Sequence, residues 1–243
     1  MSNFFAFGDE LPRGVGFTLF SGAHLAALLL CAAACAGLCL AFRRADERGK
    51  KRLRLAVGGL ILLCEVLSKG FLLLAGAYDL SYLPLHLCGL AVFFAFFHSL
   101  FPGETVGNFL YSTCMPGAFF ALLFPDWTAY PIFSYRSVLG FAVHALLVAY
   151  PLMLVLGGAL RPSVRFLPRC LAILLGLALP VYVFDRLTGL NFMFLLWPSR
   201  GSPLEWFAAL LGNPGYLLGY LPMIALIWCL LYVPFRKGKS GVK

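Results

Sequence analysis

The chain has 243 residues, of which 61% are hydrophobic and only 12% are charged, and its formal net charge is +9. A water-soluble domain carries about twice this fraction of charged residues, so the composition excludes one and predicts a single membrane domain over residues 1–243. The basic excess is divided among short segments between apolar stretches, which argues against nucleic acid as a partner.

The apolar stretches are each long enough to form a helix across a hydrocarbon core about 30 Å thick. Backbone amides in lipid must find partners within their own segment, so these stretches are expected to be helical. The sequence therefore predicts an all-α membrane protein with seven transmembrane helices. The expected spans are about 17–42, 55–77, 82–101, 106–124, 135–160, 167–188 and 216–235.

The first two spans carry three polar residues at membrane depth. His24 lies near the outer end of the first span, where it can join a binding site or cap a neighbouring loop. A charged loop, 43–54, is expected to follow. In the second span, Glu65 and Lys69 are four residues apart in the order that favours an ion pair. This pair either neutralises buried charge or leaves Lys69 to relay protons or contact a phosphate.

The third span contains a cysteine at a position suited to chemistry. Pro84 fits the first turn of a helix, and Cys88 follows about one turn into the span. Free amides at a helix N-terminus stabilise a thiolate, and a nearby imidazole would activate it as a nucleophile; the alternative is an inert buried thiol. His86 points about 200° away from Cys88 on a regular helix, so it is better placed to hold a headgroup or pin the helix end.

The later spans add one histidine and an outer polar cluster. His144 has no polar neighbour in FAVHALLVAY, so it is either the general base for Cys88 or one half of an interhelical hydrogen bond. Arg186 and Asn191 lie at the outer boundary, where Arg186 can bind a lipid phosphate or both can act as interfacial anchors. Prolines and glycines in 189–215 predict an outer loop with a short interfacial helix near 203–212.

The basic residues predict the orientation of the chain. Three groups fall in alternate connecting segments and therefore on one side of the membrane. By the positive-inside rule, the N-terminus is outside and the C-terminus is cytoplasmic. The three groups are Arg43, Arg44, Arg48, Lys50, Lys51, Arg52 and Arg54; Arg161, Arg165 and Arg169; and Arg236, Lys237, Lys239 and Lys243.

With this orientation, the polar residues converge on the outer half of the bilayer. A rise of about 1.5 Å per helical residue puts His24, Lys69, Cys88 and His144 at similar depths. Charged groups at such depths are costly, which indicates one shared polar cavity. None of the eight cysteines forms a C-x-x-C pair, and no metal or other cofactor is expected.

Four motifs carry a family resemblance: LPLHLC at 83–88, NFLYSTCMPGAFFALLFPD at 108–126, FAVHALLVAYP at 141–151 and LNFMFLL at 190–196. Their order and spacing resemble the YwaF-like bacterial membrane proteins, which are similar to the eukaryotic transmembrane protein 164 acyltransferases. The resemblance implies cysteine-dependent acyl transfer, with Cys88 as nucleophile and His144 as the essential histidine. It further implies membrane phospholipids or lysophospholipids as partners and a place in the bacterial cytoplasmic membrane.

The leading hypothesis is an integral membrane acyltransferase, or a lipid hydrolase that forms a thioester, with a Cys88–His144 dyad. His86 stays open as the alternative base. A second hypothesis is a small-solute or proton-coupled transporter that uses Glu65, Lys69 and the histidines as a relay. A third is a non-catalytic membrane protein that binds a lipid or a partner protein.

Overall fold

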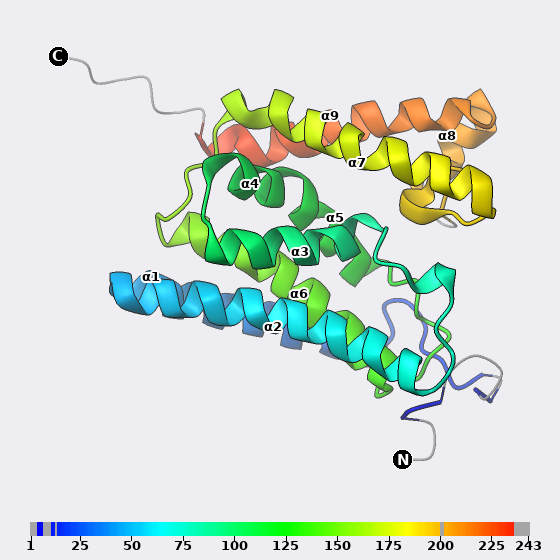
Figure 1. Ribbon diagram of the computed structural model, residues 1–243, viewed down its shortest axis with the longest axis horizontal. Coiled ribbons are helices and arrows are strands. Elements are labelled where there is room, and N and C mark those ends of the chain that lie inside the picture. The colour runs from blue at the N-terminus through cyan, green and yellow to red at the C-terminus, as the bar shows by residue number, and fades with distance from the viewer. Residues whose placement is uncertain (1–3, 7–10, 13, 200–201, 236–243) are drawn as a thin grey trace.

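The computed structural model describes residues 4–6, 11–12, 14–199 and 202–235, and every regular element within these ranges is helical (Figure 1). A π-helical turn at 110–114 joins α4 to α5, so that the two form one continuous stretch. The helices are α1 (Gly22–Arg44), α2 (Glu47–Leu74), α3 (Leu87–Leu100), α4 (Glu104–Phe109), α5 (Met115–Leu123), α6 (Tyr135–Leu156), α7 (Leu167–Thr188), α8 (Pro203–Leu211) and α9 (Tyr220–Tyr232).

Among the described residues, six helical stretches are long and apolar enough to cross a bilayer, which makes the chain a multi-pass membrane protein. The expected span at 82–101 is not among these six, because its helix, α3, has only 14 residues. A helix of that length rises about 21 Å, less than the roughly 30 Å hydrocarbon core. The six are Gly22–Arg44, Glu47–Leu74, Glu104–Leu123, Tyr135–Leu156, Val164–Thr188 and Gly215–Phe235.

Pro84 explains why the third helix begins late. It was expected inside the first turn, but the residue before a proline avoids the helical region, and Leu83 has the extended angles φ −56° and ψ 141°. The chain therefore turns once more, and α3 begins only at Leu87, with His86 as its N-cap. This delay brings Cys88 to the second position of the helix.

The expected charged loop at 43–54 is mostly helix. Only Ala45 and Asp46 separate α1 from α2. The Asp46 carboxylate caps α2 by accepting a hydrogen bond of 2.8 Å from the Gly49 amide. The basic residues that follow therefore form the first turns of α2, where Arg54 donates to the Ser99 carbonyl of α3 at 3.2 Å.

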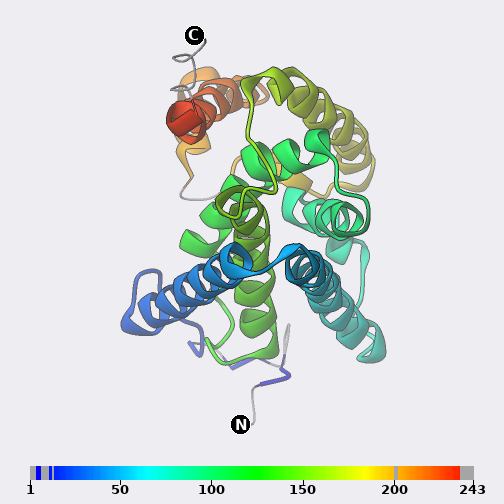
Figure 2. The same cartoon turned by 90° about the vertical axis from the view of Figure 1, so that its left-hand side faces the viewer.

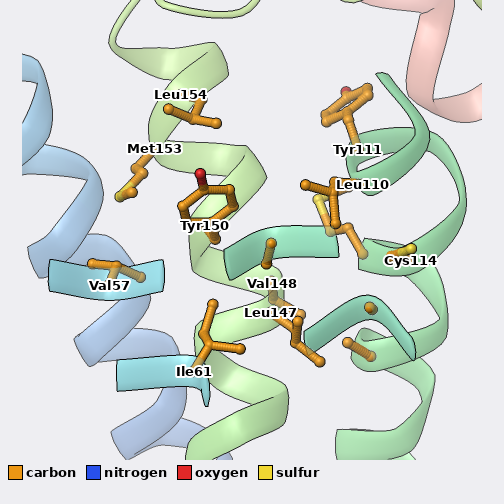
Figure 3. Close-up of a cluster of buried hydrophobic side chains, with 14 of the residues drawn as sticks. Val57, Ile61, Leu110, Tyr111, Cys114, Leu147, Val148, Tyr150, Met153 and Leu154 are labelled. Atoms are coloured by element: carbon orange, nitrogen blue, oxygen red, sulfur yellow. The ribbon is translucent and has the colours of Figure 1, made fainter. Parts of the chain in front are cut away.

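Helix α6 is the centre of the fold. It packs against α1, α2, α3 and α5, and with the α4–α5 stretch it is among the most buried parts of the bundle. Figure 2 shows α1 and α2 flanking α6 in the lower half of the view, with α7 and α9 above. The close-up in Figure 3 shows Ile61 of α2, Leu147 and Tyr150 of α6, and Cys114 of the π turn in this shared core.

The basic segments lie at one end of the bundle. In Figure 1 the α1–α2, α3–α4 and α6–α7 connections share that end, and Arg165 pairs with Glu104 across it at 2.8 Å. The basic residues at 236–243 lie outside the described residues. The common end agrees with the charge pattern, while the assignment of that end to the cytoplasm stays a prediction.

Candidate functional site

A cavity of about 1270 Å³ opens among α2, α3, α5, α6, α7 and α9. Its volume exceeds the 300–1,000 Å³ typical of pockets for drug-sized ligands. The lining contributed by α7 and α9 is largely apolar and includes Leu175, Leu179, Leu221 and Ile224. Five of the residues selected from the sequence line this one cavity, namely Glu65, Lys69, His86, Cys88 and His144.

Cys88 enters the cavity from the N-terminus of α3. It is a free, half-buried thiol at the second helical position, where backbone amides have no partner within the helix. The next residue must be small: a Cβ on Gly89 would lie 2.9 Å from the Cα, carbonyl carbon and carbonyl oxygen of Pro84. The 84–89 segment is therefore a tight backbone turn that fixes the position of the thiol.

Replacing Gly89 by alanine is expected to force the Pro84 backbone away and to displace Cys88. Overpacking of this kind destabilises a protein by about 1–3 kcal/mol. The effect is measured by thermal unfolding and by the rate at which a maleimide labels the thiol. Gly59→Ala is the matched control, because a Cβ there meets no heavy atom within 4 Å. Equal behaviour of the two variants would contradict this account of the turn.

His144 is held in one tautomer by its own helix. Its Nδ1 lies 2.7 Å from the Gly140 carbonyl oxygen. A carbonyl only accepts, so Nδ1 carries the proton and Nε2 keeps its lone pair. The ring also stacks on Trp127, with centroids 5.2 Å apart and an interplanar angle of 28°. The bond is thus within α6 and not interhelical, and it leaves Nε2 available as a base.

His86 serves a different purpose. Its Nδ1 accepts a hydrogen bond of 3.2 Å from the Met193 amide, and its ring lies against Phe192 and Phe194 at centroid distances of 5.1 and 5.5 Å. Neutral His86 therefore carries its proton on Nε2 and has no free lone pair. Of the two candidate bases, this geometry favours His144.

The 190–196 segment closes over part of the cavity. Met193 and Phe194 line it and have φ values of 53° and 56°, in the left-handed region that non-glycine residues rarely occupy. Two tyrosine hydroxyls hold this conformation: Tyr220 donates to the Met193 carbonyl at 2.9 Å, and Tyr216 donates to the Phe194 carbonyl at 2.8 Å. His86 and these two tyrosines therefore hold the loop in place.

Three residues expected to bind substrate lie outside the cavity lining. His24 is fully buried, accepts from the Phe20 amide at Nδ1 and bonds the Leu122 carbonyl through Nε2 at 3.0 Å, so it ties α1 to α5. The Asn191 side-chain amide forms hydrogen bonds within its own loop: it donates to the Trp197 carbonyl and accepts from the Leu196 amide. Arg186 is exposed on the last turn of α7.

The structure also adds two charged residues that the sequence had not singled out. Asp126 and Arg136 line the cavity together with the Glu65–Lys69 ion pair, whose charged atoms are 3.6 Å apart as the i, i+4 spacing predicts. Asp126 is the last residue of the NFLYSTCMPGAFFALLFPD motif, so this motif was the sequence signal that could have identified it.

A model of the TMEM164 family matches residues 19–232, a range that includes every residue of the cavity described above. The resemblance to transmembrane protein 164 is thereby confirmed. No curated protein and no solved structure matches the chain.

Proposed function

This chain belongs to the TMEM164 family, and from that premise we propose that it is a membrane enzyme that transfers or hydrolyses lipid acyl groups through Cys88. The observation that carries the proposal is that Cys88 and His144 line one large cavity with apolar walls. A thiol and an imidazole with a free lone pair are the parts that thioester chemistry requires.

In the proposed reaction, the Cys88 sulfur attacks the carbonyl carbon of a lipid ester while His144 Nε2 takes the thiol proton. The tetrahedral intermediate collapses, the carbon–oxygen bond breaks, and His144 returns the proton to the departing alcohol. The acyl group remains on Cys88 as a thioester. A lysolipid hydroxyl or water then attacks that thioester, with His144 again as the base, and the free thiol is restored.

The surroundings of His144 support its role as base. A thiolate is costly to form in a largely apolar cavity, so the proton is best removed as the sulfur attacks. The Gly140 carbonyl, which accepts from Nδ1–H, orients the ring and stabilises the imidazolium that forms. It thereby takes the place of the orienting carboxylate in a catalytic triad.

The apolar walls support a lipid substrate. Leu175, Leu179 and Leu221 line the cavity and are also exposed at the surface of the bundle, where lipid would surround it. An acyl chain can thus pass between α7 and α9 without leaving an apolar environment. The transport hypothesis is less favoured, because His98 is bonded to Tyr150 at 2.9 Å and does not continue the polar lining of the cavity.

The proposal is tested by locating an acyl group on the purified protein. The protein is incubated with a phospholipid that carries an alkyne on its acyl chain and is then analysed by intact-mass and peptide-mapping mass spectrometry. We expect one acyl adduct, mapped to Cys88 and removed by neutral hydroxylamine, which cleaves thioesters. Phospholipid bound without a covalent adduct would instead support the non-catalytic lipid-binding hypothesis.

A further inference from the structure

We propose that Arg136, together with Lys69, binds the phosphate group of an amphiphile at the polar end of the cavity. The inference rests on the proposed function for its lipid substrate, and it gives Arg136 the part that the sequence assigned to Arg186. Arg186 is exposed on α7 and lies outside the cavity lining, whereas Arg136 and Lys69 belong to the lining.

The position of Arg136 is fixed by the start of α6. It is the second residue of the helix, whose N-cap Ser134 accepts a hydrogen bond of 3.2 Å from the Ser137 amide. The neighbouring Tyr135 ring packs on Phe71 of α2 at a centroid distance of 4.3 Å. Phe71 is two residues after Lys69, so this aromatic contact brings the starts of the two cationic side chains to the same region of the bundle.

The charges around Arg136 leave room for an anion. Arg136 and Lys69 line the same cavity and repel each other, while Glu65 and Asp126 attract Lys69. Lys69 has a partner in Glu65 at 3.6 Å. Within the described ranges, Arg136 forms no hydrogen bond or ion pair, and the exposed Asp126 contacts neither cation within 4 Å. Arg136 is therefore left without an ion-pair partner among the described residues, and a bound anion would supply one.

The chemistry of the two cations favours phosphate. The planar guanidinium of arginine presents paired donors that match two phosphate oxygens, and lysine adds a compact point charge. The apolar walls on α7 and α9 belong to the same cavity. The ligand that fits both parts has a phosphate at one end, near Arg136, and a hydrocarbon chain along those walls.

Binding is measured in a Cys88→Ala background, so that the result does not depend on turnover. The probes are lysophosphatidylglycerol and monooleoylglycerol with the same oleoyl chain, and the readout is the dissociation constant in detergent by native mass spectrometry. Arg136→Gln is expected to weaken lysophosphatidylglycerol binding by about tenfold or more, as for loss of a charge-assisted hydrogen bond. Binding of monooleoylglycerol, which lacks the phosphate, is expected to be unchanged.

Two further variants keep the test specific. Arg136→Lys retains the charge without the fork and is expected to recover part of the affinity, which a simple folding defect would not allow. Arg186→Gln, the control at an exposed arginine outside the cavity, is expected to bind like its parent. Equal affinities of Arg136→Gln and Arg186→Gln for lysophosphatidylglycerol would overturn the proposal.

Two further measurements, one of oleate binding and one of competition by inorganic phosphate, identify the anion. Oleate binding that falls as much as lysophosphatidylglycerol binding in Arg136→Gln would overturn phosphate recognition. Displacement of lysophosphatidylglycerol by inorganic phosphate at equal concentration would overturn the assignment to a lipid, because the chain would then contribute nothing. Failure of these binding tests leaves the acyl adduct on Cys88 unaffected, and absence of that adduct leaves the binding tests valid.

Discussion

Replacing Cys88 by serine is expected to abolish the hydroxylamine-sensitive acyl adduct, with a fall in its rate of formation of at least about 10³-fold. Loss of the nucleophile in enzymes that use covalent catalysis costs this much or more. The rate is followed by intact-mass spectrometry after addition of the alkyne phospholipid. Any residual adduct on the serine would be an ester, which neutral hydroxylamine does not remove.

Cys64→Ser is the matched control for this substitution. Cys64 is a second free thiol in the lining of the same cavity, but it lies in the middle of α2 and not at a helix N-terminus. We expect the acyl adduct on Cys88 to form in the Cys64→Ser variant at the rate of the parent protein. Hydroxylamine-sensitive acylation that persists in Cys88→Ser and disappears in Cys64→Ser would rule out Cys88 as the nucleophile.

Replacing His144 by alanine is expected to slow formation of the thioester by about 10²- to 10⁴-fold, the usual contribution of a positioned general base. The binding of lysophosphatidylglycerol should be nearly unchanged, because this role concerns the reaction step. The measurement is the single-turnover rate of acylation at saturating phospholipid. Added imidazole should restore part of the rate, since the alanine leaves space for it.

His144→Asn separates catalysis from structure. The asparagine amide can still donate to the Gly140 carbonyl, as Nδ1–H does in the parent, but it supplies no base. We therefore expect His144→Asn to be as slow as His144→Ala. A rate close to that of the parent protein would mean that the hydrogen bond to Gly140 is all that His144 contributes.

The long helices were predictable from the sequence, whereas the start of α3 was not. An apolar stretch of helical length in lipid has one way to satisfy its backbone, which is why α1, α6 and α7 lie close to their expected ranges. Hydropathy alone does not show where a helix begins. The extended angles of Leu83 before Pro84 decided that, and they moved the N-terminus of α3 to the residue before Cys88.

The sequence pointed to several of the polar residues that line the cavity, but it did not show which way each side chain turns. Cys88 and His144 face the cavity, but His24, at a similar expected depth, turns into the contact between α1 and α5. Rotation about a helix axis depends on packing partners, which the order of residues does not reveal. Arg136 was overlooked for the same reason, because an arginine near a predicted helix end is usually an interfacial anchor.

The hydrogen bond between His144 and Gly140 has a mechanical consequence. Cys88 and His144 belong to α3 and α6, which pack on each other near the centre of the fold, and the tautomer of the histidine is set within α6 itself. Two of the helices that line the cavity, α7 and α9, carry neither residue. Under the proposed function, movement of these two outer helices would open a path for the acyl chain without disturbing the packing of α3 on α6.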